Sequence, residues 1–493
     1  MITAYRVEQV RSAEERAFAR LDADGVGAGA LMQRAAAGLA SVVLADLRAH
    51  GSVYGARVLV LAGAGNNGGD GLYAGARLAA RGVRVLACGV ADRVHDDGWA
   101  ALLAAGGRPV GVDEAESMIT SSKLDVVVDA VLGIGGRGGL REPADRLARA
   151  CVAARSTGAP RTIAVDVPSG VAADSGGVPE ASLRADRTVA FGALKVCHLV
   201  EPARSRCGVV ELVDIGLGED LDAGSAPALR QWELPDLRAA WPVPGPRSDK
   251  YSRGVVGIDT GSDDYPGAAI LSTLGAVHAG AGMVRFLGAD RPAAMINQLL
   301  PNVVHAGGRV QSWLLGSGWG ERPDGAEVVQ RVLDTGLPMV LDADALRFVD
   351  QIGMGDDSEH RVLLTPHAGE LARLLERERA EVEADPIGSV GDAANRTGAT
   401  VLLKGATQLV AVPGNDTVTL ALPGPAWTAQ AGSGDTLAGI CATLLAAGLA
   451  AHDAALAGAS VQALAAARLP GPVPPQELAG SLAATGRAHG LWA

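Results

Sequence analysis

A cluster of glycine, asparagine and aspartate residues at positions 63–71 (GAGNNGGDG) directly follows an apolar run and could bind a phosphorylated ligand. Glycines let the backbone approach a pyrophosphate, and the N-terminus of a following helix supplies free N–H groups. The letters GAGNNG also satisfy the G-x-G-x-x-G pattern of dinucleotide-binding loops. Such a turn does not need Asn66, Asn67 or Asp70. Their amides and carboxylate indicate polar chemistry or a cation beside the phosphates.

Two further aspartates, Asp129 and Asp166, end apolar runs and are followed by glycines. Asp129 precedes the glycine-rich loop 133–139, and Asp166 precedes Ser169 and Gly170. Each could simply form a turn, with Asp129 as a helix cap and with Asp166 and Ser169 in an Asx or Ser turn. In a parallel sheet, however, the carboxyl ends of the strands share one edge, where ligands bind. Three such loops at one edge predict a binding site that contains carboxylates.

A glycine turn in the second half, residues 432–434, leads into an apolar helix and places Asp435 in its first turn. Backbone N–H groups of such a turn form an anion hole suited to a transferring phosphoryl group. Asp435 would then be placed to take a proton from a hydroxyl group. A helix-capping role for Asp435 between flexible glycines is the simpler alternative.

Polar residues beside other apolar runs support this phosphoryl-transfer interpretation. Taken singly, a histidine at a strand end is more often structural, a lysine is usually solvated, and one of two neighbouring aspartates could cap a helix. The segments concerned are His367–Glu370, Lys404–Gln408, Asp342 with Asp344, and the tight turn Gly316–Gly318.

Short apolar runs alternate with alanine-rich stretches along the chain, which predicts mostly parallel α/β sheets. Five prolines between residues 216 and 250 mark a boundary. We therefore predict a domain at 1–220, a proline-rich linker at 221–249 and a second domain at 250–493 that ends in alanine-rich helix from Ser433 onward. The strands predicted in the first domain are 57–62, 83–90, 124–129, 162–167, 188–191 and 209–214. Those predicted in the second are 255–259, 283–287, 312–315, 339–342, 362–365, 401–403 and 408–412.

Composition limits the partners and the location of the protein. The chain has 493 residues, a net charge of -12 and a pI near 5.3, which argues against nucleic acid and anionic membranes as partners. Its five cysteines show no CxxC or metal-ligand spacing, as expected in a reducing cytosol. The charged start does not read as a signal peptide, and the longest apolar run, 439–451, is too short to span a bilayer. These features predict a soluble cytoplasmic protein.

The strings GNNGGDG, DAVLGIGGRG and DVPSG resemble signatures of the NAD(P)H-hydrate epimerase family, across nearly all of residues 1–215. The resemblance implies inversion of the hydroxyl-bearing C6 centre of hydrated NADH or NADPH, with Asp166 as the acid/base. A buried carboxylate suits that role, because inverting a hemiaminal-like carbon requires proton movement. The resemblance also implies a potassium ion held by Asn67, Asp129 and Ser169. It implies that hydrated NADPH (NADPHX) contacts Asn66, Asn67, Gly68, Gly69, Asp70, Gly133, Ile134, Gly135, Gly136, Arg137, Gly138, Gly139 and Asp166.

The strings LTPHAGE, LDADAL, LLKGAT and GSGDTLAG resemble the ADP- or ATP-dependent NAD(P)H-hydrate dehydratase family, across nearly all of residues 245–493. The resemblance implies a ribokinase-like fold, phosphorylation of the C6 hydroxyl with Asp435 as base, and Mg²⁺ at the nucleotide phosphates. The implied NADPHX contacts are Ala268, Gly318, His367 and Asp435, and the implied nucleotide contacts are Lys404, Gly405, Ala406, Thr407, Gln408 and Gly434. Departures from the family pattern are Ser248–Gly254, which makes Lys250 a weak site candidate, Ala429–Gln430, and Arg347.

Together the two resemblances imply a bifunctional repair enzyme with two α/β domains, the first Rossmann-like and the second ribokinase-like. Its substrates would be the small molecules NADHX and NADPHX, and the resemblance implies a homo-oligomer. The sequence leaves open whether ADP or ATP donates the phosphoryl group.

Two alternatives compete with this interpretation. One is an NAD-dependent oxidoreductase fused to a small-molecule kinase, with Asp92 as the ribose-binding acid. That alternative gives Asn67 and Asp70 no role. The other is a nucleotide-sensing protein without activity, which would be expected to have lost one of the candidate catalytic residues Asp166, His367 and Asp435.

Overall fold

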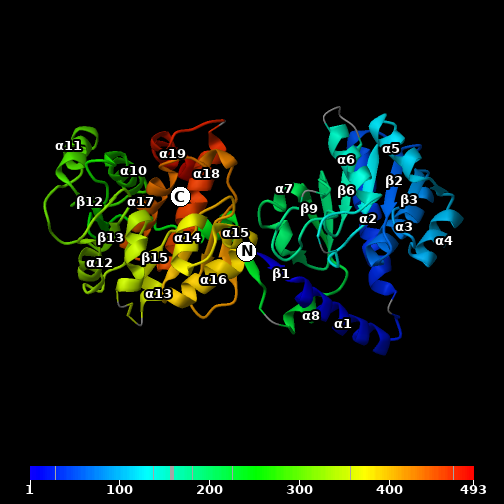
Figure 1. Cartoon of the computed structure of the whole chain (residues 1–493), viewed down its shortest axis with the longest axis horizontal. Coiled ribbons are helices and arrows are strands. Elements are labelled where there is room, and N and C mark those ends of the chain that lie inside the picture. The colour runs from blue at the N-terminus through cyan, green and yellow to red at the C-terminus, as the bar shows by residue number, and fades with distance from the viewer. Residues whose placement is uncertain are drawn as a thin grey trace. The chain divides into compact units, whose positions relative to one another are not determined.

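The chain forms two compact units (Figure 1), shown here by a computed structural model. The N-terminal unit contains Thr3–Ala228, and the C-terminal unit contains Leu229–Ala493 together with Met1–Ile2. Each unit is described by itself. The structure describes residues 1–492 except 28, 137, 156–159, 180, 225, 353, 356 and 470.

The N-terminal unit is built on a seven-stranded sheet with the order β4-β3-β2-β5-β6-β7-β9. All its neighbouring strands are parallel. Each predicted strand is present to within two residues at its ends, whereas β1 (Ile2–Tyr5), β4 and β8 (Leu194–Lys195) were not predicted. The strands are β2 (Arg57–Ala62), β3 (Arg84–Gly89), β4 (Arg108–Pro109), β5 (Val126–Ala130), β6 (Arg161–Val165), β7 (Arg187–Phe191) and β9 (Val209–Val213).

Helices cover both faces of this sheet, because alternate strand residues point to opposite faces. Val58 and Val60 of β2 pack with one cluster, and Leu59 and Leu61 pack with the other. The first cluster includes apolar residues of α1 (Val7–Ala23), α2 (Ala30–His50), α3 (Asn66–Ala79) and α4 (Asp96–Ala104). The second includes those of α5 (Val112–Thr120) and α6 (Ala144–Ala154). The unit also contains the short helices η2 (Val196–His198), α7 (Arg204–Cys207) and α8 (Gly218–Asp222).

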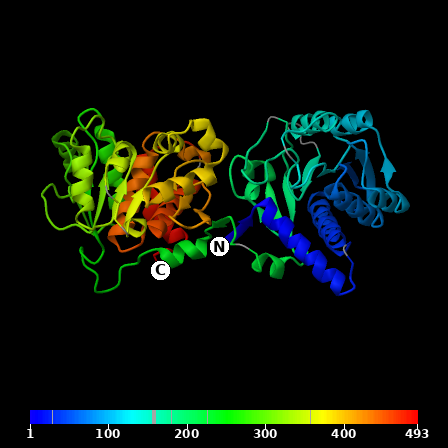
Figure 2. The same ribbon diagram turned by 60° about the horizontal axis from the view of Figure 1, so that its bottom comes forward.

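Helix α1, the blue helix that follows the N-terminus in Figure 2, is anchored at its start. It follows β1 (Ile2–Tyr5), which pairs in parallel with β8 (Leu194–Lys195), so that Tyr5 is the register partner of Lys195. The backbone N–H of Val7 donates to Asp174 Oδ1 at 2.7 Å. The start of α1 therefore lies next to the strand that carries Lys195.

Helix α2 is the one helix among the described residues that is long and apolar enough to cross a membrane by length and composition alone. Its apolar side chains, including Leu39 and Val43, lie in the core against the sheet. A buried core helix meets the same criterion, so α2 is weak evidence for a membrane span.

The C-terminal unit contains a larger sheet with the order β12-β11-β13-β14-β15-β16-β17-β18-β10. Its pairs are parallel except for β16–β17 and β17–β18. All the strands predicted for this half are present, and the α/β class is thus confirmed in both units. The strands are β11 (Val255–Asp259), β12 (Met283–Phe286), β13 (Ser312–Leu315), β14 (Met339–Leu341), β15 (Val362–Leu364), β16 (Thr400–Leu403), β17 (Leu409–Ala411), β18 (Val418–Leu420) and β10 (Leu229–Gln231).

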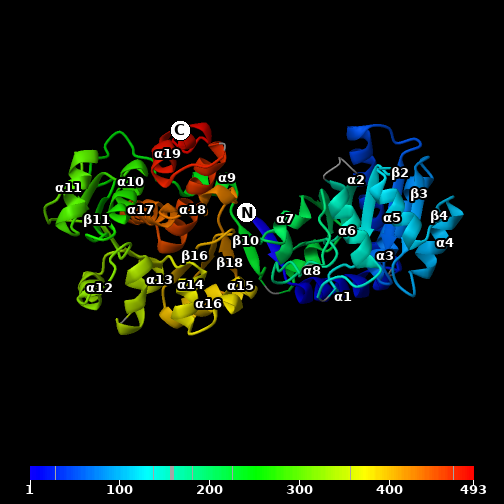
Figure 3. The same ribbon diagram turned by 45° about the horizontal axis from the view of Figure 1, so that its top comes forward.

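Two glycines bring α10 (Pro266–His278) and α17 (Ser433–Ala446) into backbone contact, and the helices lie side by side in Figures 1 and 3. A Cβ on Gly275 would lie 2.2 Å from Thr436 O, and one on Gly439 would lie 2.0 Å from Ser272 O. This close packing fixes the start of α17. The remaining helices are η3 (Ala343–Gln351), η4 (Ala426–Thr428), α9 (Leu234–Ala240), α11 (Asp290–Leu299), α12 (Gly325–Leu333), α13 (Ser358–Arg361), α14 (Ala368–Leu375), α15 (Arg379–Ala384), α16 (Pro386–Thr397), α18 (Ala451–Arg468) and α19 (Pro475–Ala488).

Part of the stretch predicted as a linker, 221–249, is ordered in the C-terminal unit. It contains β10 and α9, and it buries Leu237 and Trp241 in the core of that unit. Proline content alone did not reveal these elements, because Pro235 is accommodated in the first turn of α9, where a missing N–H is harmless.

Two candidate active sites

Asp166 lies directly after β6 and has a left-handed backbone conformation, with φ at 64°. This conformation is unfavourable for a residue with a side chain and persists only where neighbours hold it. The Asp166 N–H donates to Val189 O at 2.8 Å, and its Oδ1 accepts from the Phe191 N–H at 3.1 Å. Backbone contacts with β7 therefore fix the carboxylate at the carboxyl edge of the sheet.

Lys195 forms a buried ion pair with Asp166, and sequence reasoning did not identify it. Its side chain is 1% exposed, and its Nζ donates to Asp166 Oδ1 at 2.5 Å and to Phe191 O at 3.0 Å. A lysine inside the apolar run TVAFGALKVCHLV was a signal that could have found it, since a buried charge needs a partner.

His198 contacts the backbone of both residues of this ion pair. Burial, together with the charge of Lys195, lowers its pKa to about 4, so the ring is neutral at physiological pH. Its Nδ1 accepts from the Lys195 backbone N–H at 3.0 Å, and its Nε2 lies 2.9 Å from Asp166 O. Both contacts are satisfied by one tautomer, in which Nε2 carries the proton.

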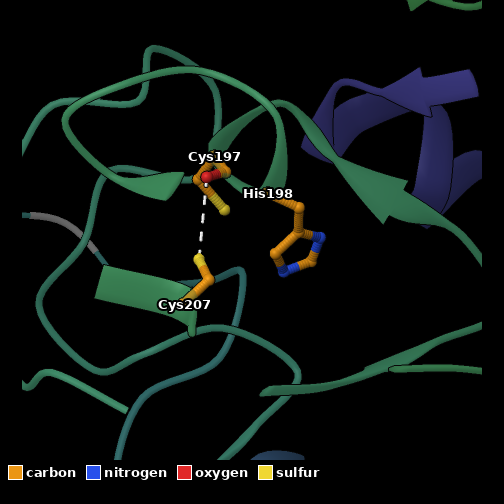
Figure 4. Close-up of side chains that lie close together, drawn as sticks. All are labelled: Cys197, His198 and Cys207. Atoms are coloured by element: carbon orange, nitrogen blue, oxygen red, sulfur yellow. Dashed lines mark hydrogen bonds between the residues drawn. The ribbon is translucent and has the colours of Figure 1, made fainter. Parts of the chain in front are cut away.

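Cys197, His198 and Cys207 lie close together in this region (Figure 4), with candidate ligand atoms within 4.8 Å of one another. Both ring nitrogens of His198 are already engaged with Asp166 and Lys195. The Cys207 thiol donates to Cys197 O at 3.6 Å, the contact drawn as a dashed line. Because neither ring nitrogen of His198 is left to bind a metal, Cys197, His198 and Cys207 do not have the character of a metal site.

Asp70 and Glu14 bring two more carboxyl groups near Asp166 and Lys195. Asp70 of α3 is 9% exposed, and its buried Oδ1 has no hydrogen-bond partner in the described residues. Burial, followed by the charges of Asp166 and Glu14, holds the pKa of Asp70 well above its usual value, although Lys195 opposes the shift. Burial also raises the pKa of Glu14 on α1, which sequence reasoning did not identify.

The two glycine-rich loops expected to bind the substrate contact each other. A Cβ on Gly133 would lie 3.0 Å from Asn67 Oδ1, and one on Gly63 would lie 2.0 Å from Val131 O. The Arg11 guanidinium of α1 reaches over the second loop, where its Nη2 is 3.2 Å from the position of a Cβ on Gly135. Of the predicted contact residues, Asn66, Gly68 and Gly69 start α3, Ile134, Gly136, Gly138 and Gly139 belong to the second loop, and Arg137 lies outside the described residues.

Asp129 and Ser169, two of the predicted potassium ligands, are in direct contact. Asp129 is fully buried, with its Oδ1 2.6 Å from Ser169 Oγ and its Oδ2 2.8 Å from the Ser169 N–H. Burial raises the pKa of Asp129 to about 6, against the opposing effect of these hydrogen bonds. Asn67, the third predicted ligand, has a buried Nδ2 without a hydrogen-bond partner in the described residues. Asp129 is fully buried and no lysine or arginine of the described residues pairs with it, which fits a site where a bound cation supplies the opposite charge.

In the C-terminal unit, Asp435 lies in the first turn of α17, behind the glycine turn. Gly432 has φ at 89°, and a Cβ on Gly434 would lie 3.2 Å from Lys404 Nζ, so the lysine ammonium reaches the start of the helix. Burial, then the charges of Asp342 and Glu370, raises the pKa of Asp435 to about 7, although Lys404 opposes the shift. Asp435 can therefore exchange a proton near neutral pH.

A buried polar network holds Lys404 in place. Its Nζ donates to Asp342 Oδ1 at 2.6 Å, and Asp342 also accepts from Ser317 Oγ and Thr365 Oγ1, each at 2.7 Å. Burial would raise the pKa of Asp342, but Lys404 and the two hydroxyls bring it below its usual value. These side chains follow β13, β14, β15 and β16, so four strand ends meet here as the acidic strand-end pattern predicts. Asp344 instead binds Gly320 N–H and Arg347.

His367 caps α14 as well as facing outward. Its Nδ1 accepts from the N–H groups of Gly369 and Glu370, and Glu370 Oε2 accepts from the His367 N–H at 2.8 Å, which forms a capping box. The side chain is 54% exposed, and Nε2 lies 3.4 Å from Glu370 Oε1. The Lys404 backbone N–H donates to Pro366 O, so the loop that carries His367 adjoins the network of Lys404 and Asp342.

The other predicted residues of this unit fall in two places. Ala268 and Gly318 touch, since a Cβ on Gly318 would lie 2.6 Å from the Ala268 Cβ. Gly405, Ala406, Thr407 and Gln408 form the turn between β16 and β17, where Gln408 Nε2 donates to Gly405 O at 3.4 Å. Lys250 precedes β11 and stacks on Tyr251 at 5.3 Å, which places it at the opposite edge of the sheet from Asp435.

Comparison with known proteins gives matches in both units. The family described as NAD(P)H-hydrate dehydratase matches residues 256–479, and the family described as YjeF-related protein N-terminus matches residues 28–197. The bifunctional NAD(P)H-hydrate repair enzyme Nnr of Mycobacterium tuberculosis (strain ATCC 25618 / H37Rv) is 42% identical over 459 residues, which is 92% of this chain and 90% of that protein. The enzyme of the same name from Escherichia coli (strain K12) is 34% identical over 413 residues, 81% of this chain and 78% of that protein. Among solved structures, an ADP/ATP-dependent NAD(P)H-hydrate dehydratase from Bacillus subtilis is 24% identical, with a TM-score of 0.48, and covers 53% of this chain and 98% of that chain.

Proposed function

Because this chain belongs to the family of bifunctional NAD(P)H-hydrate repair enzymes, we propose that its two units repair hydrated NADH and NADPH in two successive reactions. The N-terminal unit epimerises the R and S forms of NADHX and NADPHX. The C-terminal unit dehydrates the S form to NADH or NADPH and consumes ADP or ATP. The observation that carries the proposal is that each unit places one aspartate, Asp166 or Asp435, beside a lysine that is held in an ion pair at the carboxyl ends of parallel strands.

Asp166 is the acid/base residue of the epimerase in this proposal. The C6 carbon carries both a hydroxyl and the ring nitrogen N1, so it is a hemiaminal, and its configuration can invert when the ring opens and closes again. Opening requires removal of the hydroxyl proton, which a carboxylate at a fixed position can accept. Asp166 is fixed by Phe191 and by Lys195, and the same contacts keep its Oδ1 in one place.

The first residues of α3, 66–70, and the glycine loop 133–139 would bind the dinucleotide around this carboxylate. The N-terminus of α3 offers N–H groups and a positive dipole end to the pyrophosphate. Arg11 adds a full positive charge beside Gly135, and a guanidinium matches the geometry of phosphate oxygens. An N-terminal helix outside the matched family region 28–197 thus contributes to substrate binding.

Potassium would be held by Asn67, Asp129 and Ser169. These residues offer an amide oxygen, a carboxylate and a hydroxyl, which are suitable donors for a hard monovalent cation. When bound, the ion supplies positive charge that stabilises the buried Asp129 carboxylate and holds the two glycine loops together.

Asp435 is the base of the dehydratase in this proposal. It takes the proton of the C6 hydroxyl while the hydroxyl oxygen attacks the terminal phosphoryl group of the nucleotide. The C6–O bond then breaks with phosphate as the leaving group, and loss of the C5 proton restores the ring double bond. The N–H groups at the start of α17 and the ammonium of Lys404 face the transferred group, where negative charge needs stabilisation. Mg²⁺ would neutralise the nucleotide phosphates.

The remaining parts of the proposal concern the whole protein. A homo-oligomer in the cytoplasm, with NADHX, NADPHX and a nucleotide as its small-molecule partners, suits a repair enzyme of this family and the acidic charge of the chain. The alternative of an NAD-dependent oxidoreductase fused to a kinase is not supported, because relatives that match most of the chain are bifunctional NAD(P)H-hydrate repair enzymes.

One experiment tests both reactions. The protein is incubated with mixed epimers of NADHX, and NADH absorbance is followed with ADP, ATP or neither. Complete conversion with one nucleotide is expected, because epimerisation feeds the S form to the dehydratase. Conversion that stops at the S fraction would contradict the epimerase, and no conversion with either nucleotide would contradict the dehydratase.

A further inference from the structure

Three carboxyl groups of the N-terminal unit share one buried lysine. Asp70, Asp166 and Glu14 act electrostatically on one another, and Lys195 acts on all three. The Lys195 ammonium is committed to Asp166 Oδ1 at 2.5 Å and to Phe191 O at 3.0 Å. Glu14 has the additional influence of Arg11 on the same helix face, three residues away. Asp70 therefore has the least compensation for a negative charge.

The position of Asp70 is set by close packing of α3 on the sheet. A Cβ on its neighbour Gly71 would lie 2.5 Å from the Ala130 Cβ at the end of β5, so the first turns of α3 press against that strand end. Asp70 is three residues after Asn67 and shares its face of the helix. Each of the two side chains has one buried polar atom, Asp70 Oδ1 and Asn67 Nδ2, without a hydrogen-bond partner in the described residues.

Orphaned buried polar atoms cost free energy and are rare in native proteins, so a pair of them on one face of a helix indicates a missing partner. The face in question borders the carboxyl edge of the sheet, where Asp166 follows β6 and where β5 and β6 are paired. A ligand held between the glycine loops would meet this face. An ionised Asp70 would repel the pyrophosphate of such a ligand, whereas a neutral carboxylic acid can donate to it.

We propose that Asp70 is a second catalytic residue of the epimerase and acts as the general acid opposite Asp166. The inference rests on the proposed epimerase function and names the group that supplies its second proton. Asp166 takes the proton of the C6 hydroxyl, the C6–O bond becomes a carbonyl, and the C6–N1 bond breaks. Asp70 gives its proton to N1, which receives the electron pair of the broken bond.

The ring then closes on the other face of the carbonyl. Rotation about the C5–C6 bond turns the carbonyl, N1 attacks C6, and the N1 proton returns to Asp70. Asp166 returns its proton to the carbonyl oxygen, which becomes the C6 hydroxyl again. Atoms and protons balance over the cycle, and only the configuration of C6 has changed.

The environments of the two carboxyl groups suit these opposite roles. Asp166 accepts from the Lys195 ammonium and from the Phe191 N–H, which hold its Oδ1 in one place. Burial, together with the negative charges of Asp166 and Glu14, favours the protonated form of Asp70, as its raised pKa indicates. Two acids with environments that separate their protonation states are the usual arrangement of an acid/base pair.

The test is the variant Asp70→Asn in the full-length protein, which keeps the shape of the side chain but cannot give up a proton. Epimerase kcat is expected to fall at least about 10²-fold, with KM nearly unchanged, because a general acid contributes to the rate and not to ground-state binding. The matched control is Asp46→Asn. Asp46 is as well buried and is paired with Arg161, at the start of β6 and away from the carboxyl edge. D46N should lose stability and keep its epimerase kcat.

A structural role for Asp70 is distinguished by two further measurements. D70N should melt no lower than the wild type, since burial and the charges of Asp166 and Glu14 disfavour the charge that the amide removes. The wild-type epimerase rate should fall as pH rises and Asp70 loses its proton, and the residual D70N rate should lack that fall. Equal epimerase kcat of D70N and wild type would overturn this inference alone. Absence of epimerisation by the wild-type protein would overturn the proposed function and this inference with it.

Discussion

Each unit buries one lysine against one aspartate, but the two lysines contact aspartates of different kinds. In the N-terminal unit, Lys195 contacts Asp166, the candidate acid/base residue itself. In the C-terminal unit, Lys404 contacts Asp342, and the candidate base Asp435 is a third residue nearby. The same type of ion pair therefore performs two tasks, since it fixes the reacting carboxylate in one unit and the lysine in the other.

The difference leaves Asp435 without the ammonium contact that holds Asp166. Asp435 has no such contact and lies near the charges of Asp342 and Glu370, and burial raises its pKa to about 7. A base with that pKa is well matched to neutral pH. Lys404, held by Asp342, is left to serve the phosphoryl group in the proposed reaction.

The largest expected effects come from removing each base in turn. Asp166→Asn should lower epimerisation, and Asp435→Asn should lower nucleotide-dependent NADH formation, each by about 10² to 10⁴. The other reaction should keep its rate in each variant. The measurement uses purified epimers, so that D166N still converts the S form at the normal rate and D435N still interconverts R and S. Loss of both reactions in either variant would show that the sites are coupled.

D435N also separates a base from a capping or metal-holding residue. The N–H groups at the start of α17 are backbone groups and remain in the variant, so calorimetry should give near-native affinity for ADP or ATP. The raised pKa of Asp435 means that the folded state holds a proton that the unfolded state has released, so stability falls as pH rises from about 4 to about 7. D435N should therefore melt no lower than the wild type at pH 8. A collapse of nucleotide affinity would move the search for the base to His367.

The second effect in size is the loss of a buried ion pair. Lys195→Met and Lys404→Met each leave a buried carboxylate uncompensated, which typically destabilises by about 3 to 5 kcal/mol. The side chain of Lys195 is more deeply buried than that of Lys404, so K195M should lose more stability than K404M. Urea unfolding measures both, with exposed Lys123→Met and Lys250→Met as controls.

A double variant sharpens this comparison. In K195M/D166N the unpaired buried charge of Asp166 is also removed, so the double variant should be more stable than K195M. The same recovery is expected for K404M/D342N in the other unit. If K195M unfolds at the same urea concentration as K123M, the buried pair does not anchor the site.

The third effect is the pH dependence of the dehydratase. As a base, Asp435 must be ionised, so the rate should rise with pH and reach half its maximum near pH 7. Glu370→Gln removes a negative charge that raises this pKa and keeps the cap of α14, so the midpoint should move to lower pH. The exposed Glu376→Gln is the control and should leave the midpoint in place. A midpoint that is the same in wild type and E370Q would remove Asp435 as the titrating group.

The sequence predicted the sheets and the aspartate loops because both depend on local patterns. Apolar runs located the strands, Asp129 and Asp166 follow from their positions at strand ends, and Asp435 follows from its place in the first turn of a helix. Lys195, His198 and Glu14 could not be placed in this way, because their contacts depend on β1 pairing with β8 and on the packing of α1. Composition did contain a signal. The chain has only four lysines, and two of them form buried ion pairs at the candidate sites.

The last prediction concerns a second pair of buried carboxylates, Asp129 and Asp342. Both are at most 1% exposed, and Asp342 is compensated by Lys404, whereas no lysine or arginine of the described residues pairs with Asp129. A potassium ion would give Asp129 the positive charge that Lys404 gives Asp342. Replacing potassium by tetramethylammonium should therefore lower the melting temperature of the N-terminal unit and its epimerase rate, while the C-terminal unit keeps its stability. An ion present at ten times its Kd stabilises the folded state by about 1.4 kcal/mol.

The control for this prediction is Asp129→Asn, which removes the buried charge and should remove the response to potassium. Asp342→Asn should leave that response intact, because Asp342 has its cation within the protein. If the wild type melts at the same temperature in both salts, Asp129 is stabilised by Ser169 alone, and its two hydrogen bonds of 2.6 and 2.8 Å suffice without an ion.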